Sequence, residues 1–390
     1  MNILVLTPWY PTKVHTYSGI FVREYAKAIR DHCNVIVLHC GVVDQTLPSW
    51  WAIEKEHDPE LTDGIPTYRV MFKRSPIWGI SFIRYIGSVY RATRKLLNQH
   101  WRPDLVHAHT DGAGLLAVLI GKLLDIPVVI SEHSSGFARG LLSKYALFQA
   151  KIVFQLADTV LPVSQALQKT LQQNGVRAIF QVVPNIVDTS LFHFQSQSLN
   201  SDGIIRLLAV SSSDENKGLA ILFSALPMVS WNGRPWRLDV VGVGKEPQDM
   251  RLHKIVNDLG FSSNVIFRGR MHKTDVAQMM RAADLFVLSS IVETFSVATA
   301  EALASGLPVL VTRCGGPEEF VTKHAGMIVS PGEAGELASA LEKMIELLPT
   351  YDRTAIANEA KERFGAASLG GTLYELYQKL VKNYSHNRAN

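Results

Sequence analysis

The chain has 390 residues, of which 47% are apolar, and a formal net charge of +4. A chain of this length is expected to form two domains, because single hydrophobic cores rarely grow beyond about 250 to 300 residues. The small net charge excludes a strongly basic nucleic-acid-binding protein as the default interpretation. Cys33, Cys40 and Cys314 show no CxxC spacing, which argues against a disulfide framework or a cysteine zinc site and favours a reducing cytoplasmic compartment.

Short β-branched or leucine-rich runs alternate with helical patterns along the chain, which is typical of helices layered on parallel sheets. The N-terminal run, Ile3 to Leu6, is too short for a signal peptide or a membrane span. Further strands are expected at 34–39, 67–71, 105–108, 128–131, 159–163 and 181–183, and, after a polar linker at 195–202, at 205–210, 237–241, 265–268, 285–288, 308–311 and 326–329.

This pattern predicts two doubly wound parallel-sheet domains, residues 1–195 and 203–367. A last helix at 368–386, with leucines at 369, 373, 376 and 380, is expected to pack back on the first domain. Ligands of such sheets bind beyond the carboxyl ends of the strands, so the loops after the strands are the places to search for a site.

The segment 69–102 carries basic residues and no acidic residue. The basic residues are Arg69, Lys73, Arg74, Arg84, Arg91, Arg94, Lys95 and Arg102. Apolar and aromatic residues between them, several at helical spacing, favour a basic amphipathic surface that rests on anionic lipid. A core-packed helix with a solvated basic face, or a groove for an anionic glycan, would give the same pattern.

Three histidines, His107, His109 and His133, lie in or shortly after predicted strands of the first domain. Together they raise the question of a zinc site. Because they have neither a helical HxxxH spacing nor a cysteine partner, we predict no metal site.

Glu293 and Glu301 lie between two predicted strands, one just before and one inside a helical pattern of small residues. Helical spacing would separate the two carboxylates by roughly 12 Å. Paired glycosidase carboxylates lie about 5 to 9.5 Å apart, so this spacing does not suit one bond-cleaving pair. It suits two contacts to one long ligand, with the start of the helix between them offering N–H groups to an anion. A nucleotide sugar has this layout. The alternative is a loop glutamate beside a solvent-facing helical one.

With these residues in view, the chain resembles the retaining, nucleotide-sugar-dependent glycosyltransferases of family 4. The resemblance is carried by Glu293-x7-Glu301 followed by Gly306-Leu307-Pro308-Val309, by Ala282-Ala283-Asp284-Leu285-Phe286-Val287, by the two histidine-bearing strands, and by Val183-Pro184-Asn185-Ile186-Val187-Asp188. It implies the GT-B fold, in which two Rossmann-like domains face each other across a cleft.

The resemblance also implies roles for individual residues. Glu293 would hold hydroxyls of the transferred sugar, Glu301 the ribose hydroxyls and Lys217 the diphosphate, while backbone N–H groups at Thr294, Phe295 and Ser296 would stabilise the departing phosphate. His133 would contact the sugar. Gly19 and the pair Gly315-Gly316 would let the backbone approach the donor, and 267–270 would contact the base through the backbone. The alternative for Lys217 is an ordinary surface lysine at the start of a helix. The alternative for the glycines is an ordinary turn.

One position departs from the family. An arginine usually lies five residues before the diphosphate lysine, and here that position is Ser212. A serine hydroxyl cannot replace the charged fork of an arginine. Either another cation such as Arg270 compensates, or the diphosphate is bound less tightly, or the protein is inactive.

The sequence therefore predicts a retaining hexosyltransferase that uses a nucleotide diphosphosugar, with a uridine nucleotide favoured and no cofactor or divalent metal. The acceptor would be the hydroxyl of a glycan, a lipid-linked sugar or a small molecule, in surface polysaccharide or glycolipid assembly. The expected location is the cytoplasm, peripheral to the inner face of the membrane. The alternatives are an epimerase of the same fold and a non-catalytic sugar-binding relative. A dehydrogenase is disfavoured because no GxGxxG follows the first strand.

Overall fold

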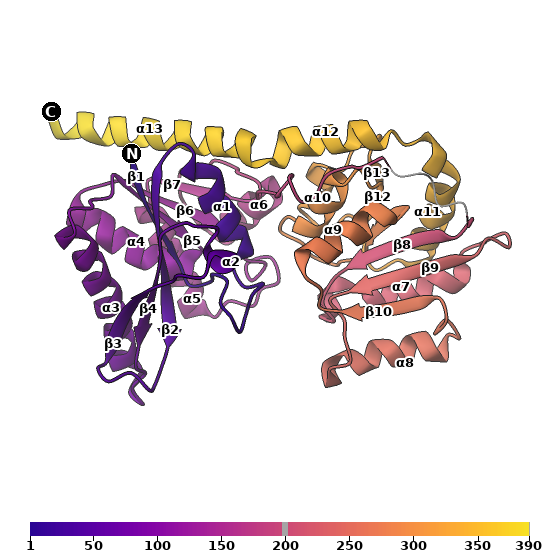
Figure 1. Ribbon diagram of the computed structural model, residues 1–390, viewed down its shortest axis with the longest axis horizontal. Coiled ribbons are helices and arrows are strands. Elements are labelled where there is room, and N and C mark those ends of the chain that lie inside the picture. The colour runs from indigo at the N-terminus through magenta and orange to yellow at the C-terminus, as the bar shows by residue number, and fades with distance from the viewer. Residues whose placement is uncertain (197–201, 390) are drawn as a thin grey trace. The chain divides into compact units, whose positions relative to one another are not determined.

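The computed structural model describes residues 1–196 and 202–389, and the chain divides into two compact units (Figure 1). The first unit comprises Met1–Ile186 and Ala366–Asn390, and the second comprises Val187–Gly365. This division lies before the boundary at 195 that the sequence led us to expect. Of the predicted linker 195–202, residues 197–201 lie outside the described residues.

The first unit contains a seven-stranded sheet in the order β3-β4-β2-β1-β5-β6-β7. The strands are β1 (Asn2–Thr7), β2 (Asn34–Val43), β3 (Trp51–Lys55), β4 (Thr67–Phe72), β5 (Leu105–His109), β6 (Val128–Glu132) and β7 (Thr159–Pro162). Neighbouring strands are parallel except β3, which pairs antiparallel with β4 at one edge. The inner strands β1, β5 and β6 are almost entirely buried, as expected for a parallel sheet covered on both faces.

The helices of the first unit are α1 (Ile20–Arg30), α2 (Pro59–Thr62), α3 (Trp78–Asn98), α4 (Asp111–Leu124), α5 (Lys144–Leu156), α6 (Gln165–Gln173) and α13 (Ala366–Ala389). One face of the sheet is covered by α1 and α13, which share a core with Ile3, Val5 and Val129. Leu369, Leu373 and Leu376 of α13 belong to that core, because their helical spacing places them on one side of the helix.

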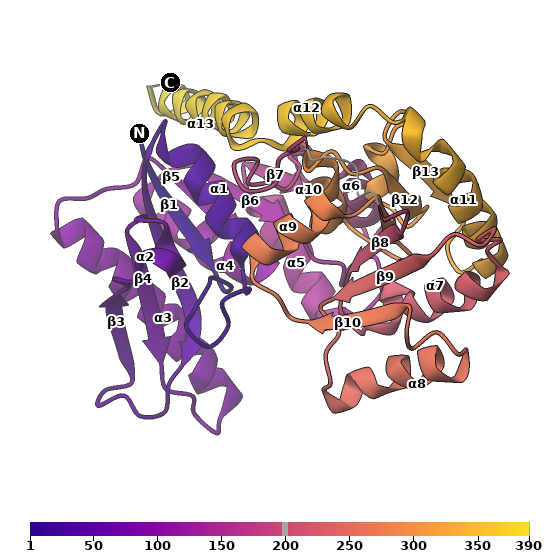
Figure 2. The ribbon, with the colours of Figure 1, turned by 45° about the vertical axis from the view of Figure 1, so that its right-hand side comes forward.

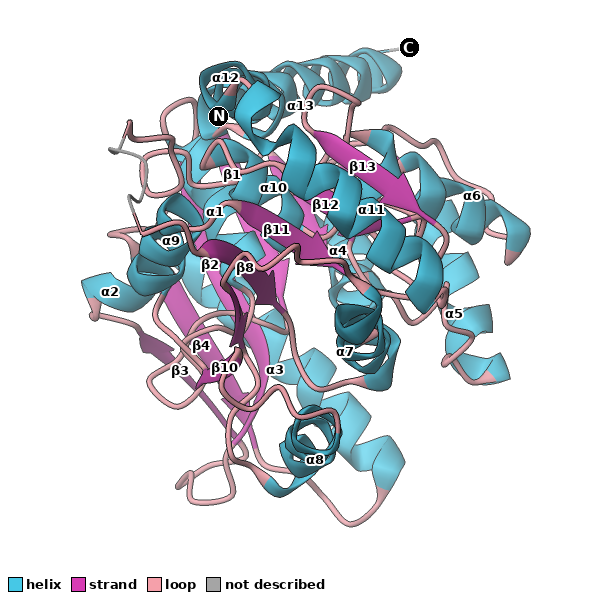
Figure 3. Cartoon of the chain, turned by 90° about the vertical axis from the view of Figure 1, so that its right-hand side faces the viewer, coloured by secondary structure: helices cyan, strands magenta, loops and turns pink. Residues whose placement is uncertain are grey.

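The second unit contains a six-stranded parallel sheet in the order β10-β9-β8-β11-β12-β13. The strands are β8 (Ile205–Val210), β9 (Trp236–Val241), β10 (Val265–Gly269), β11 (Leu285–Leu288), β12 (Val309–Thr312) and β13 (Gly326–Val329). The helices are α7 (Leu219–Ala225), α8 (Met250–Asp258), α9 (Lys273–Ala282), α10 (Val297–Ala304), α11 (Ala334–Leu347) and α12 (Arg353–Phe364). Figure 2 shows β8, β9 and β10 side by side, and Figure 3 shows helices on both sides of the strands.

The predicted α/β class and the two doubly wound parallel sheets are confirmed. Two details were wrong. Residues 181–183 form no strand, although the N–H groups of Gln181 and Val183 donate to carbonyls of β7. The edge strand β3 was missed, because its short sequence Trp-Ala-Ile-Glu-Lys has neither a β-branched run nor clear alternation. Among the described residues, no helix is both long enough and apolar enough to cross a membrane.

Candidate active site

The strand order of the second sheet reverses between β8 and β11, which are neighbours in space but not in sequence. In open α/β sheets such a switch point leaves a crevice beyond the carboxyl ends of the two strands. The loop 211–218 follows β8 and the loop 289–296 follows β11. Lys217 and Glu293, which the sequence singled out, lie in these two loops.

Lys217 and Glu293 form an ion pair in which Nζ lies 2.8 Å from Oε1. The Ser290 hydroxyl donates a second hydrogen bond of 2.9 Å to the same carboxylate oxygen. Lys217 ends a short 3-10 helix, Glu215–Lys217, whose N-terminus is capped by the Asp214 side chain. The structure therefore brings the predicted phosphate cation and the predicted sugar-binding carboxylate into direct contact.

Backbone hydrogen bonds fix the loop that carries Glu293. Its N–H donates to the carbonyl of Cys314 (2.8 Å) and its carbonyl accepts from Gly316 N (3.0 Å). The Asn216 side-chain amide donates to the carbonyl of Val292 (2.8 Å). Loops after β8, β11 and β12 are thereby held together, and the predicted pair Gly315-Gly316 lies beside Glu293.

Gly316 has a steric reason to be glycine. A Cβ there would lie 2.4 Å from the carbonyl oxygen of Thr294 and 2.6 Å from Phe295 N, distances no real Cβ tolerates. Gly315 has φ +122°, in the left-handed region that favours glycine. Gly316 is therefore needed for packing between loops and Gly315 for its backbone conformation, and neither need requires a ligand.

Ser296 begins α10 in a left-handed conformation, with φ +67°. This conformation is costly for a residue with a side chain, and such strain is concentrated at functional sites. The Ser296 hydroxyl caps the helix by accepting from Thr299 N. The ring of Phe295 points into a buried aromatic cluster with Phe320 and Phe364, at centroid distances of 5.1 and 5.5 Å. Of the predicted group Thr294 to Ser296, Phe295 can therefore offer a ligand only its backbone.

Glu301 is buried in α10 and forms an ion pair with Lys273, the first residue of α9, at 3.1 Å. The Lys273 ammonium also lies 5.6 Å from the centre of the Phe192 ring. Sequence reasoning missed Lys273, because nothing in its local pattern distinguishes it from a surface lysine at the start of a helix. The predicted ribose-binding carboxylate is thus held by a cation.

Ser212 and Arg270 are both exposed, in the loop after β8 and directly after β10. In the sheet β9 separates β8 from β10, so Ser212 and Arg270 do not follow neighbouring strands.

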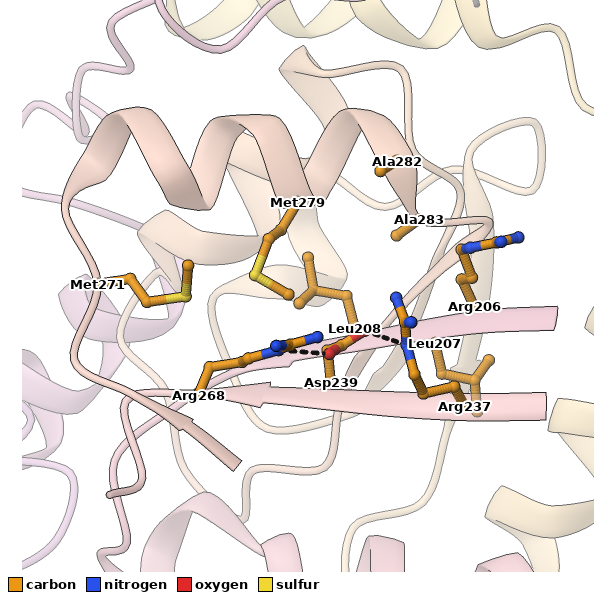
Figure 4. A pocket seen from close by; sticks show the side chains of 10 residues that line it. All are labelled: Arg206, Leu207, Leu208, Arg237, Asp239, Arg268, Met271, Met279, Ala282 and Ala283. Carbon is orange, nitrogen blue, oxygen red and sulfur yellow. Dashed lines mark hydrogen bonds and ion pairs between the residues drawn. The ribbon is translucent and has the colours of Figure 1, made fainter. Parts of the chain in front are cut away.

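The side chain of Arg268, in the predicted base-binding segment 267–270, forms an ion pair within the sheet. Its Nε lies 2.7 Å from Oδ1 of the buried Asp239, whose other oxygen accepts from Arg237 at 2.9 Å. These three side chains line a cavity of about 230 Å³ between α9 and the strands β8, β9 and β10 (Figure 4).

In the first unit, Gly19 is the N-cap of α1 and has φ +65°. A Cβ at this position would lie 2.1 Å from the carbonyl oxygen of Trp9. The close contact between the loop after β1 and the start of α1 therefore requires glycine, whether or not a ligand binds there.

His133 follows β6 and uses both ring nitrogens within the first unit. Nδ1 lies 2.9 Å from the side-chain oxygen of Asn185, and Nε2 lies 3.0 Å from Nδ1 of His109. Burial lowers the pKa of His133 to about 3, so the ring is neutral. A sugar contact through the ring would require one of these hydrogen bonds to open.

The other histidines extend this polar cluster. His107 bonds Ser131 through Nε2 (2.8 Å) and Tyr377 of α13 through Nδ1 (2.6 Å). Nε2 of His109 is buried and has no hydrogen-bond partner among the described residues. Within the same residues, no group of three or more potential ligands is arranged to hold a metal ion.

The sequence analysis missed Glu132, the fully buried last residue of β6. Its carboxyl group accepts hydrogen bonds from the backbone N–H groups of Asp111, His133 and Ser134. Burial raises the pKa of Glu132 well above its usual value, and the nearby Asp111 carboxyl acts in the same direction. This side chain fixes the backbone on which His133 lies.

Known proteins match both halves of the chain. Residues 18–191 match the family model described as Glycosyltransferase Family 4, and residues 192–363 match the model described as Glycosyl transferases group 1. A glycogen synthase of Mycobacterium tuberculosis is 24% identical over 373 residues, covering 89% of this chain and 86% of the relative. TuaC of Bacillus subtilis, named as a glycosyltransferase of teichuronic acid biosynthesis, is 26% identical, covering 98% of this chain and 99% of that protein.

Solved structures share the fold. The crystal structure of Anabaena Alr3699/HepE in complex with UDP matches with a TM-score of 0.77 at 23% identity, covering 97% of this chain and all of that chain. Sucrose-phosphate synthase from Thermosynechococcus elongatus matches with the same score at 19% identity, covering 98% of this chain and all of that chain.

Proposed function

Because the chain is a glycosyltransferase of the family 4 type with the GT-B fold, we propose that it transfers a hexose or hexose derivative from a nucleotide diphosphosugar to an acceptor hydroxyl, with retention of configuration. The observation that carries the proposal is the Lys217–Glu293 ion pair beyond the switch point of the second sheet. A cation and a carboxylate at this place match the two charged or polar parts of such a donor, its diphosphate and its sugar hydroxyls.

In the proposed complex the donor replaces the internal partners of these side chains. The diphosphate takes the Lys217 ammonium and the N–H groups at the start of α10, and the sugar hydroxyls donate to Glu293. Glu301, inside the same helix, accepts from the ribose hydroxyls. Fixed positive groups at the leaving phosphate lower the barrier because negative charge grows there in the transition state.

The proposed reaction needs no protein nucleophile. The bond between the anomeric carbon and the phosphate oxygen breaks, and the acceptor oxygen attacks from the same face, which gives retention. The leaving phosphate takes the proton of the acceptor hydroxyl. Lys217 and the N–H groups near Thr294 to Ser296 stabilise the nucleoside diphosphate in place of a divalent metal.

A uridine nucleotide is the favoured donor, since Anabaena HepE, which shares the fold, has been crystallised with UDP and with UDP-glucose. The acceptor is proposed to be a glycan or a lipid-linked sugar, in line with relatives named for glycogen synthesis and for teichuronic acid biosynthesis.

A thermal-shift screen of nucleotide sugars tests donor binding, because a bound ligand raises the melting temperature by mass action. The screen should be run with EDTA, where the uridine donor should still give a shift. Product analysis with the best donor then separates three outcomes. Transfer with retained anomeric configuration supports the proposal, whereas release of an altered free sugar without acceptor would indicate an epimerase.

The third outcome is donor binding with no chemistry, which would indicate a sugar-binding relative. Ser212 favours this alternative, because a serine replaces the arginine that the family places at the diphosphate. Calorimetric binding together with the absence of transfer to any acceptor would establish it.

A further inference from the structure

The helices α3, α4 and α5 form one layer on the first unit. α3 contacts α4, and α4 contacts α5. Gly114 of α4 packs closely against Ile130 of β6 and Val153 of α5, and Gly121 packs against Val128. Val129, the residue between Val128 and Ile130, points to the opposite face, where α1 and α13 lie. The layer of α3, α4 and α5 therefore covers the face of the sheet away from α13.

The outer side of this layer is unusually apolar. It carries nine of the twenty large apolar side chains that are exposed among the described residues. These are Ile80, Ile83 and Tyr90 on α3, Leu119 and Leu123 on α4, and Tyr145, Phe148, Ile152 and Leu156 on α5. Ile83 is 69% exposed, and Tyr145 and Phe148 are each 62% exposed. Soluble proteins rarely gather so many apolar side chains on one face unless the face binds something.

The four apolar residues of α5 are spaced by three, four and four positions, so they form a continuous stripe along the helix. Its opposite side faces the core through Ala150, Val153 and Phe154. A helix that is apolar on both sides needs a second apolar environment, and water does not provide one.

The same layer is positively charged. Its helices contain Arg84, Arg91, Arg94, Lys95, Lys122, Lys144 and Lys151, against a single acidic residue, Asp111. Arg94 and Lys95 are exposed beside Tyr90. An apolar stripe flanked by cations on one outer face is the composition of surfaces that lie at the boundary of a bilayer containing anionic lipid.

We propose that the outer face of α3, α4 and α5 binds an anionic phospholipid surface. Its isoleucine, leucine, tyrosine and phenylalanine side chains enter the boundary between headgroups and acyl chains, and its arginines and lysines contact lipid phosphates. A soluble anionic glycan would match the cations but would leave Ile83, Phe148 and Ile152 in water. The inference concerns attachment and does not depend on the proposed reaction.

This surface includes α3, which lies within the segment 69–102 that the sequence indicated, but the two are not the same surface. Two residues of that segment are not available to a membrane. Arg69 is buried and bonds Glu56 and His39, and Phe72 is buried against Tyr85. The stripe on α5 and the two leucines on α4 lie outside the segment, and they supply most of the aromatic and leucine surface.

Co-sedimentation with vesicles tests the proposal. Vesicles of phosphatidylcholine alone are compared with vesicles containing phosphatidylglycerol. The wild type should bind the anionic vesicles at least tenfold more tightly, and added salt should weaken this binding because it screens the charges. Replacing Tyr145, Phe148 and Ile152 by glutamate (Y145E, F148E, I152E) should abolish it.

Two matched double variants test whether vesicle binding depends on the position of the cations or only on the net charge of the protein. Arg94→Glu with Lys95→Glu changes two exposed cations of α3, and Lys379→Glu with Lys382→Glu changes two exposed cations of α13, on the other face. Both lower the net charge by the same amount. The first should lose at least tenfold in affinity for anionic vesicles, while the second should bind like the wild type.

Three outcomes would overturn the proposal. The first is that the wild type binds both vesicle types equally. The second is that the two charge variants lose the same affinity for anionic vesicles. The third is that the wild type forms a dimer which the triple α5 variant does not form, because the stripe would then bind a second copy of the chain. Donor-induced thermal shifts should be the same in all variants. A failure of donor binding in the wild type would contradict the proposed function and leave the membrane result unaffected.

Discussion

Lys273 of α9 holds Glu301 of α10 in an ion pair of 3.1 Å, and Glu301 is almost completely buried. The two residues are far apart in the sequence and lie on different helices. The carboxylate that is proposed to receive the ribose hydroxyls is therefore kept in place by a residue that the sequence did not single out.

Replacing Lys273 by methionine should weaken both folding and donor binding. The change leaves a buried carboxylate without its cation, which is expected to cost about 1–3 kcal/mol in the free energy of unfolding. The KM for the donor should rise about tenfold, because Glu301 loses its fixed position. Urea denaturation and donor titration measure the two effects, and Lys273→Arg should restore much of both. Lys254→Met, in an exposed pair with Asp258, is the control; an equal effect there would disprove the role of Lys273.

Lys217→Met and Glu293→Ala should each reduce turnover by about 10² or more, because the first removes charge stabilisation and the second removes positioning of the sugar. The two residues touch, so the double variant should lose less than the product of the single losses. Steady-state kinetics on the three variants provides the measurement. Wild-type turnover in Glu293→Ala would refute its assignment.

Gly316→Ala should destabilise the second unit by about 1–3 kcal/mol, because the new methyl group overlaps the backbone of Thr294 and Phe295. The displaced loop carries Glu293, so activity should fall further than the loss of folded protein explains. Gly335→Ala in α11 is the matched control, since a Cβ there meets nothing within 4 Å. Similar stability and activity of the two variants would contradict this account.

Ser212→Arg should strengthen donor binding about tenfold, which corresponds to about 1.4 kcal/mol and is within the range of a charge-assisted hydrogen bond. The variant places a cation where the resemblance to family 4 leads us to expect one beside the diphosphate. Isothermal calorimetry with the nucleoside diphosphate measures the change. Ser263→Arg adds the same charge before β10 and serves as the control; an equal gain there would show a nonspecific effect of charge.

Because of His107, the first unit should become less stable as the pH falls below 6.5. Burial, together with the nearby His133, lowers the pKa of His107 from 6.5 to about 3, so the unfolded chain binds a proton in this range that the folded chain does not. The free energy of unfolding is therefore unaffected by His107 above pH 6.5 and decreases as the pH falls towards 3, because protonation of this residue favours the unfolded chain. Urea denaturation between pH 7 and pH 5 should show a smaller loss of stability in His107→Gln than in the wild type. Identical pH slopes would contradict the prediction.

The sequence was sufficient to predict both sheets, because parallel strands buried on both faces are short apolar runs that stand out between helices. Glu293 could also be singled out from its place between two strands, because position relative to a strand end is a local property. Lys217 and Gly316 were indicated only by the resemblance to family 4 glycosyltransferases.

Other features depend on tertiary contacts and have no local signal. The Lys273–Glu301 pair and the contact between His109 and His133 join separate elements. The stripe on α5 resembles an ordinary buried helix face in the sequence, and only the fold shows that it faces outward. For the same reason Phe72 and Tyr85 looked available to a membrane but are packed against each other.

The hydrogen bond between Tyr377 and His107 joins the last helix to the centre of the first sheet, although the whole second unit lies between these two residues in the sequence. During synthesis the ribosome releases Val187–Gly365 as one uninterrupted piece before α13 emerges. We therefore expect the second unit to fold first, because the first unit cannot complete its core until α13 has been synthesised. A stop codon placed before Ala366 would leave that earlier half without the helix that closes its core.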